Sequence, residues 1–359
     1  MKEFLKKKNI VFSAKRYGID ALGAMAQGLF CSLLIGTIVK TIGQQMNLPF
    51  LVDVGGYCAA MSGPAMAVAI GYALQAPPRV LFSLATVGYA ANALGSTTLS
   101  GAAGAGGPLA VLFIAIAAAE AGKAVSKETR VDILVTPLVT ILSGVALAAL
   151  VAPAIGTAAS SVGEFIEWAT VLQPFWMGIL VSVVMGIALT LPISSAAICA
   201  ALGLTGLAGG AAVAGCCAQM VGFAVVSFRE NRWGGLVSQG IGTSMLQMGN
   251  IVKNPRIWIP ATLASAITGP VATCVFGFQM NDPAGGVASG MGTCGMVGPI
   301  GVYAGWVNDV ALGVKASITG MDWMAMALIC FILPAVLAWL IGMACRKLGW
   351  IKDGDMKLD

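Results

Sequence analysis

The sequence contains no histidine and few charged residues, and both shortages exclude classes of function. Without histidine the chain has no imidazole to act as a general base, to bind a metal or haem, or to carry a phosphate. Charged residues make up 10% of the 359 residues, whereas a soluble domain averages about a quarter. The chain therefore cannot cover a surface that faces water. Its net charge of +5 does not indicate nucleic-acid binding, because much of it lies in the N-terminal segment 1–16.

Cysteine pairs of the metal-binding type are also missing. The nine cysteines stand singly or adjacent within apolar segments, and no CxxC pair occurs. We expect free thiols that pack as small hydrophobic groups, rather than disulfides or a metal site. The sequence also shows no set of nucleophile and base that would point to catalysis. We therefore predict no metal, no cofactor and no enzymatic activity.

Long apolar runs are what the sequence has instead. Hydrophobic residues make up 58% of the chain, and the mean hydropathy is +0.89. Such a chain is solvated by lipid, and its long continuous runs differ from the short alternating strands of a membrane β-barrel. We predict an all-α, polytopic transmembrane protein of about ten spans, with re-entrant or broken helices.

Basic residues near the two ends orient the chain in the membrane. Cytoplasmic segments carry an excess of Lys and Arg, so segment 1–16 and the tail 348–359 are both expected in the cytoplasm. Between them we predict a single transmembrane domain, 17–347, in a bacterial inner membrane. A signal peptide is the competing interpretation of the N-terminus. However, Ile19–Val39 is longer than the apolar core of a signal peptide, which favours an uncleaved first helix.

Several apolar runs are interrupted. Phe50–Leu74 contains a Ser-Gly-Pro break at 62–64, which needs a polar or protein-lined setting in the membrane. Ala196–Phe228 is too long for one straight helix and predicts a hairpin of two short or tilted segments. Pro153–Thr170 has acidic but no basic residues, so we expect an external loop there. Within it, Val162–Ala169 is amphipathic and is predicted to lie along the interface.

The densest group of polar residues lies between long apolar segments, in Ser227–Gly249. Two arginines precede the run Leu236–Ile251, and Lys253 and Arg256 follow it. Because both flanks are basic, both are expected on the cytoplasmic side. The run is therefore predicted to be a re-entrant hairpin rather than a full crossing.

Two interpretations of this hairpin stay open. Gln239, Thr243, Gln247 and Asn250 are spaced by three or four residues and would share one face of a helix. Such a face is tolerated within a membrane when it packs on another helix, or when it lines a wet cavity. The residues either hold helices together or line the path of a polar solute.

Glu230 also has two interpretations. In the first, it belongs to a solvated cytoplasmic loop together with the neighbouring arginines. In the second, it lies at a cavity with Arg229 as its partner and hydrogen-bonds the hydroxyl groups of a solute. Ionisable groups near membrane depth are costly, which favours a functional role.

Two further breaks accompany the polar stretch, in Leu191–Ser195 and in the Gly-rich tract after Asn281. In one interpretation, the first break is an ordinary kink and the second an external turn. Alternatively, both breaks present backbone and side-chain groups to a solute, as the discontinuous helices of transporters do. The candidate solute-binding residues are Glu230, Asn231, Gln239, Thr243, Ser244, Gln247, Asn250, Ser194, Ser195, Asn281, Asp282 and Thr293.

Three parts of the chain resemble a known family. They are VDILVTPLV at Val131–Val139, TLPISSAA at Thr190–Ala197, and the stretch Ser227–Pro255 followed by Gly290–Thr293. Together they cover roughly residues 50 to 320 and are similar to the membrane EIIC subunits of the bacterial sugar phosphotransferase system. The nearest branch is the one whose members are labelled perfringolysin-regulator-type proteins.

The resemblance implies a membrane domain that handles a solute and forms a homodimer. Fructose-type members carry an Asp-Gly-Gly-Pro-rich turn where this chain has the uncharged residues Thr190 and Leu191. Phosphotransferase uptake also uses phosphohistidine and phosphocysteine, and this chain has no histidine and no recognisable soluble domain to carry them. Phosphorylation of the solute would therefore need separate cytoplasmic phosphotransferase proteins.

From these observations we expect an EIIC-like transporter of a small polar, sugar-like solute, without phosphorylation domains of its own. It would work by alternating access, through movement of the domain that holds the solute. The alternative is a membrane sensor or regulator that binds the solute without transporting it. The expected partners are the solute, the lipid bilayer and a second copy of the chain, and no nucleic acid.

Overall fold

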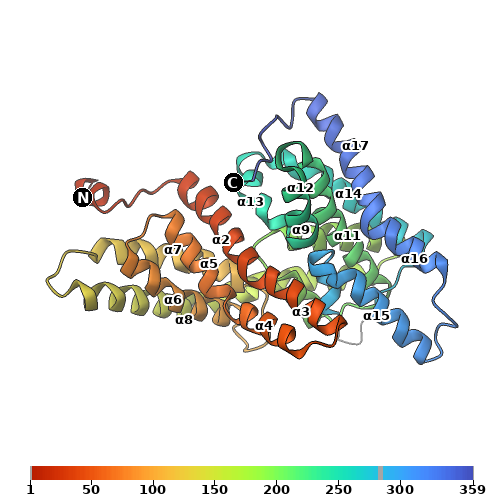
Figure 1. Ribbon diagram of the computed structural model, residues 1–359, viewed down its shortest axis with the longest axis horizontal. Helices are drawn as coiled ribbons and strands as arrows, with labels where there is room; N and C mark the ends of the chain where they lie inside the picture. The colour runs from red at the N-terminus through yellow and green to blue at the C-terminus, as the bar shows by residue number, and fades with distance from the viewer. Residues whose placement is uncertain (1, 282–285, 359) are drawn as a thin grey trace. The chain divides into compact units, whose positions relative to one another are not determined.

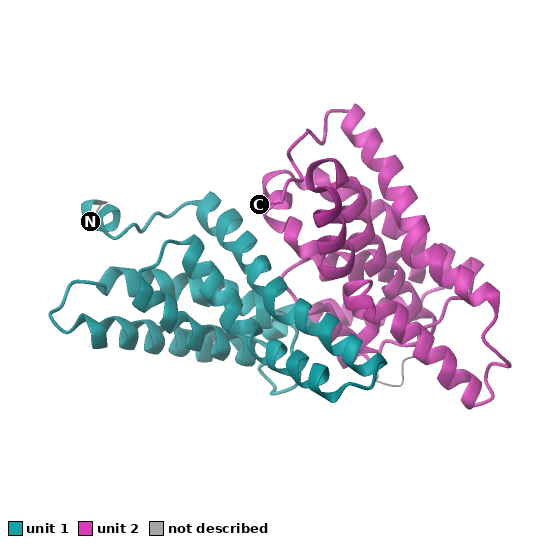
Figure 2. Cartoon of the chain, viewed as in Figure 1, with its two compact units in different colours: residues 1–160 teal, residues 161–359 magenta. Residues whose placement is uncertain are grey.

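The structure, a computed structural model, describes residues 2–281 and 286–358. These residues form helices joined by loops, with two isolated β-bridges, Thr97–Ala103 and Gly206–Met280 (Figure 1). The predicted all-α class is confirmed. The chain divides into two compact units, Met1–Ser160 and Ser161–Asp359 (Figure 2). The predicted limits of the membrane domain, 17–347, stay a prediction.

Six helical segments of the described chain are long and apolar enough to cross a membrane. A seventh is added if the bent pair Pro49–Ala60 and Ser62–Ala73 counts as one span, and Pro174–Thr190 is a shorter apolar helix. With these shorter pieces, the predicted total of about ten membrane segments is compatible with the structure. The six are Arg16–Gln45, Gly107–Val125, Asp132–Thr170, Gly206–Val226, Pro255–Val275 and Gly320–Lys347.

Unit 1 holds the first half of the helices. The break predicted at 62–64 falls at Met61, where α4 and α5 meet at an angle of 49°. Pro64 lies in the first turn of α5, where its missing N–H leaves no helical hydrogen bond unmade. The helices are α1 (Lys2–Lys7), α2 (Ala21–Leu29), α3 (Ile35–Gln45), α4 (Pro49–Ala60), α5 (Ser62–Ala73), α6 (Pro78–Gly95), α7 (Gly107–Val125) and α8 (Asp132–Thr170), with π-helical turns η1 (Arg16–Asp20) and η2 (Phe30–Leu34).

Helix α8 differs from the sequence prediction. It runs for 39 residues without a break, so the external loop predicted for Pro153–Thr170 is helical, and Val162–Ala169 is its last part. The helix contains Pro137 and Pro153. Each proline removes only one helical hydrogen bond, and the Ala-rich segments beside Pro153 are strong helix formers. Because α8 passes residue 160, it belongs to both units.

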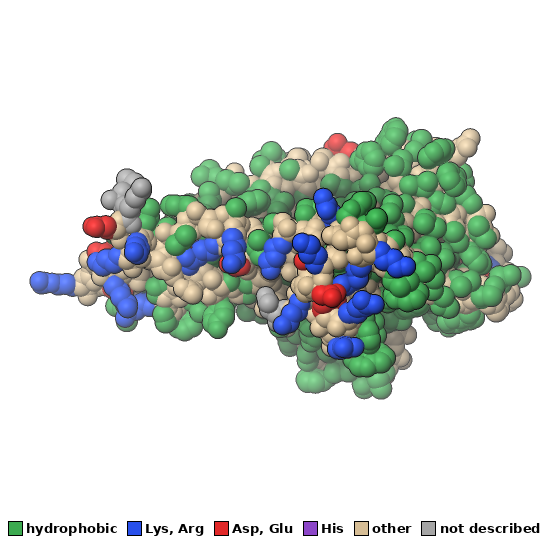
Figure 3. Space-filling view, turned by 90° about the horizontal axis from the view of Figure 1, so that it is seen from above, with side chains coloured by type: hydrophobic (Ala, Val, Ile, Leu, Met, Phe, Trp, Pro, Cys, Tyr) green, Lys and Arg blue, Asp and Glu red, His purple; other side chains and the backbone are tan. Residues whose placement is uncertain are grey.

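Basic residues of unit 1 gather where its N-terminal segment meets two of its loops. Lys8 pairs with Glu128 at 2.5 Å, and Asn9 donates to Gln75 at 2.7 Å. The hydrogen bond from Lys8 holds the pKa of Glu128 below its usual range. Loops 74–77 and 126–131 therefore lie at the same end of unit 1 as the basic N-terminus. Basic side chains show as separate groups between wide hydrophobic areas in Figure 3.

Unit 2 contains the candidate site. Its helices are α9 (Pro174–Thr190), α10 (Ser195–Ala201), α11 (Gly206–Val226), α12 (Phe228–Val237), α13 (Met248–Lys253), α14 (Ile259–Pro270), α15 (Val297–Ala311), α16 (Gly320–Ala327) and α17 (Leu333–Lys347). Short turns join them: η3 (Ser238–Gly242), η4 (Ser244–Gln247), η5 (Pro255–Trp258), η6 (Val271–Val275), η7 (Val287–Gly290), η8 (Cys294–Met296) and η9 (Leu328–Ile332).

The predicted hairpin in Ala196–Phe228 has unequal limbs. Its first limb, α10, has only 7 residues and is about 10 Å long, so it cannot cross a hydrocarbon core of about 30 Å. Its second limb, α11, has 21 residues and is about as long as that core is thick. Only α11 can cross the membrane, because the chain turns back early at 202–205.

Glycine sets the close packing of α9, α11 and α14. Gly215 in α11 lies against the backbone of Ser182 in α9, and an added Cβ would overlap the Ser182 carbonyl. In α14, Gly269 lies equally close to the backbone of Gly178. Small residues let membrane helices approach this closely, which replaces hydrophobic burial as the main source of helix association.

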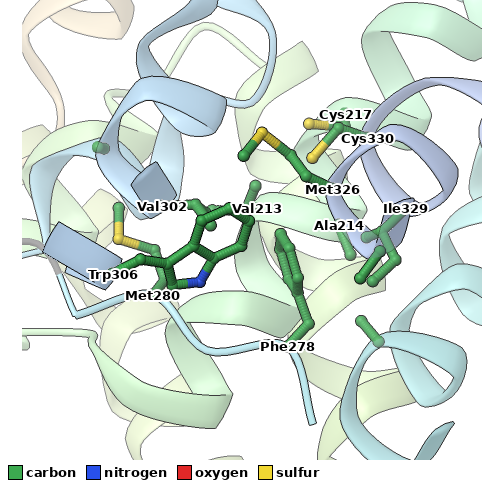
Figure 4. Close-up of a cluster of buried hydrophobic side chains, with 13 residues drawn as sticks. Val213, Ala214, Cys217, Phe278, Met280, Val302, Trp306, Met326, Ile329 and Cys330 are labelled. Carbon is green, nitrogen blue, oxygen red and sulfur yellow. The ribbon is translucent and has the colours of Figure 1, made fainter. Parts of the chain in front are cut away.

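A hydrophobic cluster fixes the other side of α11. Phe278 and Met280 pack with Trp306 of α15 and with buried residues of α11 and η9 (Figure 4). Cys217 and Cys330 belong to this cluster, and all nine cysteines are free thiols, as expected. The cluster holds the segment after η6 against α11.

Candidate functional site

Three helix breaks of unit 2 occur at different points of the chain. α9 ends at Thr190, and the chain stays non-helical through Pro192 and Ser194. The second break separates the π-turn η3 from η4, with an extended residue, Thr243, between them. The third joins η7 and η8 through Gly292, whose φ is +53° and whose Cα faces the backbone of α11 at Cys216. Both the left-handed φ and this close approach require glycine.

The folded chain brings these three breaks together. The Thr190 and Ser244 hydroxyls are hydrogen-bonded at 2.8 Å, which joins the first break to the second. The Ser195 hydroxyl donates to the Gly290 carbonyl at 2.7 Å, which joins the first to the third. The Thr293 hydroxyl donates to the Gly240 carbonyl, which joins the third to the second. We call this meeting point the junction.

Gln219 of α11 lies beside Thr190 at the junction. Its Oε1 accepts from Trp258 Nε1 at 3.0 Å and from the Thr190 hydroxyl at 3.4 Å. Its Nε2 donates to the Thr262 hydroxyl at 3.2 Å. Gln219 is completely buried, whereas Trp258 and Thr262 are half-buried. Sequence reasoning missed this residue, although an amide alone in an apolar span is a signal, because buried polar groups in membranes are costly.

The junction is polar but carries no charge. It is built from hydroxyl groups, backbone carbonyls and one side-chain amide, each of which donates or accepts hydrogen bonds. Such groups match the hydroxyls of a neutral solute and would not balance an ion. Among the described residues, no three His, Cys, Asp or Glu side chains lie close enough to hold a metal.

The polar stretch turns back on itself, so that both of its flanks lie at one end of unit 2, and its re-entry into a membrane stays a prediction. We call α12, η3, η4 and α13 the hairpin, and residues 348–358 the tail. Before the turn, Asn231 Nδ2 donates to the Met356 carbonyl at 2.8 Å. After it, Asn254 Nδ2 donates to the Trp350 carbonyl at 2.9 Å. Both flanks therefore lie at the end of unit 2 where the tail is bound.

The predicted polar face of the hairpin forms a chain of amides that ends on the tail. Gln239 donates to the Ser227 hydroxyl at 2.8 Å and accepts from Gln247 at 2.9 Å. Gln247 accepts from Asn250 at 2.9 Å and also donates to the Met356 carbonyl at 2.9 Å. Asn250 donates to the tail at Lys357. In the structure these buried amides bond to protein groups.

Thr243 does not share a regular helical face with these amides. Its backbone is extended, and its hydroxyl accepts from the Met245 amide at 3.1 Å as the cap of η4. Helical spacing predicted a common face, but the helix is interrupted here, next to Gly240 and Gly242. The same interruption turns Ser244 toward Thr190 and so builds the junction.

Glu230 has a different partner from the one predicted. Its Oε1 accepts from Arg346 of α17 at 2.7 Å, and its side chain is 7% exposed. Arg346 also pairs with Asp353 of the tail at 3.1 Å. The neighbouring Arg229 is exposed instead. Sequence proximity suggested Arg229, but α12 turns Glu230 inward against α17.

The remaining predicted site residues lie in two places. Ser194 caps α10 by accepting from the Ala197 amide at 3.2 Å, close to the junction. Asn281 lies at the N-terminal end of α11. There its Oδ1 accepts from the Gly206 amide, and its Nδ2 donates to Asp309 at 2.8 Å. Asn281 therefore does not join the junction. Asp282 lies outside the described residues.

A polar cavity of about 340 Å³ lies near the N-terminal end of α11. It is bounded by Glu167 and Thr170 of α8 and by the turn between α10 and α11. The tail and this cavity are thus at opposite ends of α11, with the junction between them.

Removal of one amide should release the tail. Asn231→Ala deletes the bond to Met356 and the bond that its Oδ1 accepts from the Leu358 amide at 2.8 Å. Two hydrogen bonds of about 1 kcal/mol each correspond to a roughly thirtyfold rise in the released population. Cleavage of the detergent-solubilised protein after Lys352 by a lysine-specific protease measures this rise. Asn308→Ala in α15 is the matched control and should leave the cleavage rate unchanged, whereas equal rates for the two variants would contradict the role of Asn231.

Comparison with protein families places the chain beside known proteins. The model of a family described as "Phosphotransferase system, EIIC" matches residues 19–358. Searches of curated proteins and of solved structures found no match. The matched range includes almost all of both units.

Proposed function

The chain belongs to the EIIC family of the phosphotransferase system, and from this premise we propose that it carries a small, uncharged, sugar-like solute across the membrane by alternating access. The family is that of the membrane component of sugar uptake, which is not itself a catalytic enzyme. The observation that carries the proposal is the junction, where three helix breaks meet around Thr190, Gln219 and Ser244.

The chemistry of the junction supports a neutral solute with several hydroxyls. Discontinuous helices in transporters free backbone and side-chain groups for a substrate near the middle of the membrane. Here the freed groups are hydroxyls, carbonyls and an amide, and each internal bond can be exchanged for a bond to a sugar hydroxyl. Ser194, Ser195 and Thr293 extend this surface along the first and third breaks.

We assign the predicted residues Glu230, Asn231, Gln239, Gln247 and Asn250 to an inner gate. Their bonds to Arg346 and to the tail close the hairpin at one end of unit 2. The 340 Å³ cavity lies at the other end. Alternating access requires that a solute at the junction be reachable from one side at a time, and the bound tail blocks the hairpin side in this state.

Orientation and partners follow from charge and from the family. Lys and Arg mark the hairpin and tail end as cytoplasmic by the positive-inside rule. The chain has no histidine, so a phosphohistidine would lie on a separate cytoplasmic phosphotransferase protein. We also propose a homodimer, as the resemblance to EIIC subunits implies. Crosslinking in native membranes tests it, and a purely monomeric pattern would contradict it.

Counterflow of labelled sugars in proteoliposomes tests transport. Thr190→Val removes the hydroxyl that reaches Ser244 and Gln219, and we expect about a fivefold weaker apparent affinity, since one hydrogen bond contributes about 1 kcal/mol. Thr268→Val is the matched control, because Thr268 is equally buried but bonds only within α14, to Ala264. Equal losses in the two variants would show that the junction does not bind the solute.

The alternative function, a sensor without transport, makes a different prediction. The bound tail supports it, because a solute that displaces the tail would signal its own presence to the cytoplasm. In that case a sugar would raise the thermal midpoint and change tail cleavage, with no counterflow at any concentration. Measurable counterflow would exclude a sensor that does not transport.

A further inference from the structure

A second cavity of unit 2 lies outside the junction, although it shares Arg346 with the inner gate. Its volume is about 370 Å³, and it lies between the end of α11, the start of α12 and the end of α17. Its residues are mostly apolar or aromatic, with arginines beside them. They are Val225, Val226, Phe228, Arg229, Trp233, Leu236, Trp339, Gly342, Met343 and Arg346.

The two arginines of this cavity differ in their surroundings. Arg346 is half-buried and already shared between Glu230 and Asp353. Arg229 is exposed, and within residues 2–281 and 286–358 its guanidinium has no hydrogen-bond or ion-pair partner. A free guanidinium with five N–H donors at the rim of an apolar cavity is suited to bind a phosphate.

The cavity also lies where lipid headgroups are expected. It is formed at the C-terminal ends of two candidate membrane spans, Gly206–Val226 and Gly320–Lys347. Trp233 is 71% exposed and Trp339 is 49% exposed. Tryptophan is enriched at the membrane–water interface, because its ring is apolar and its N–H is polar.

We propose that this cavity binds one anionic phospholipid. The acyl chain packs against Val225, Trp339 and Met343, and the phosphate binds the Arg229 guanidinium. Basic pockets between membrane helices on the cytoplasmic side are suited to anionic headgroups. Charge complementarity selects an anionic lipid over a neutral one, and the apolar lining selects a lipid over a free phosphate.

The position of Arg229 ties this lipid to the hairpin. Arg229 directly precedes Glu230 and Asn231, which bind Arg346 and the tail. A phosphate on Arg229 therefore holds the start of α12 in the orientation that the tail requires. The proposal does not depend on the identity of the transported solute.

The test measures lipid binding to the purified, delipidated protein in detergent. Short-chain phosphatidylglycerol is the probe, and phosphatidylcholine of the same chain length and inorganic phosphate are the comparison ligands, with the thermal midpoint and native mass spectrometry as readouts. We expect phosphatidylglycerol alone to bind and to stabilise. Arg229→Ala should weaken its binding about fivefold, the effect of one basic residue. Lys347→Ala removes a charge from the same end of α17 without lining the cavity, and should leave binding unchanged.

Three outcomes would overturn the proposal. Equal binding of the two lipids would mean an apolar groove with no selection for charge. Equal binding of inorganic phosphate would mean an ion site, with no role for the apolar walls. Crosslinking of a Trp233→Cys variant to a second copy of the chain in membranes, with no lipid bound to the purified protein, would mean a protein interface. Each outcome leaves the counterflow test of the junction unaffected, so the two proposals fail independently.

Discussion

Gly215→Ala is expected to lower the thermal midpoint of the solubilised protein by about 4 °C. The new methyl group would occupy the space of the Ser182 carbonyl, so α9 and α11 have to move apart along their whole contact. Neither overlapping atom belongs to a flexible side chain. Overpacking of this kind costs about 3 kcal/mol, which corresponds to a shift of this size in a protein of a few hundred residues.

The effect of Gly215→Ala extends to the site. The contact that it separates is the one that sets Thr190, at the end of α9, beside Gln219 of α11. We therefore expect solute binding to fall together with stability. Gly234→Ala is the matched control, because Gly234 of α12 has open space around it and alanine favours helix. A thermal midpoint that falls equally in both variants would mean that α9 and α11 are not held by close backbone contact.

Gln219→Met is expected to weaken solute binding about thirtyfold while the protein stays folded. Methionine fills a similar volume, so the packing of α11 is kept. The substitution removes the acceptor of Trp258 and Thr190 and the donor to Thr262. The solute would lose two hydrogen bonds to the Gln219 amide, which lowers its binding free energy by about 2 kcal/mol. Equilibrium binding of a labelled sugar measures this loss of affinity.

Gln239→Met separates the two parts of the proposed mechanism. Gln239 is buried like Gln219, but its amide belongs to the chain that ends on the tail. We expect sugar affinity within about twofold of the unmodified protein and faster cleavage of the tail, since the hydrogen bonds of Gln239 to Ser227 and Gln247 are lost. The reverse pattern, with affinity lost in Gln239→Met and kept in Gln219→Met, would place the solute on the hairpin instead of at the junction.

The sequence was sufficient to predict features that depend on composition and on local breaks. The membrane class follows from the hydropathy, and the hairpin follows from basic residues on both of its flanks. The three breaks were visible as Pro, Gly and polar residues within apolar runs. That they meet at α11 needed the structure, because their contacts join residues far apart in the chain, such as Thr190 with Ser244.

Partners of individual polar groups were predicted less well. Local spacing suggested Arg229 for Glu230, whereas the fold supplies Arg346, 116 residues away. Gln219 stood alone in an apolar run, so no cluster of polar residues drew attention to it. The continuity of α8 also differs from the prediction, because Pro153 and the absence of basic residues favour a loop, whereas the strong helix propensity of alanine keeps the segment helical.

The bound tail has a consequence for how the protein is made. Asn250 donates to the Lys357 carbonyl, and the two residues are 107 positions apart. Ribosomes add roughly 5–20 residues each second. The tail is therefore synthesised several seconds after the hairpin. A hairpin inserted during that time would have neither water nor the tail as a partner for its amides. Membrane insertion of the hairpin is therefore expected to finish late in synthesis, after the downstream helices have been placed around it.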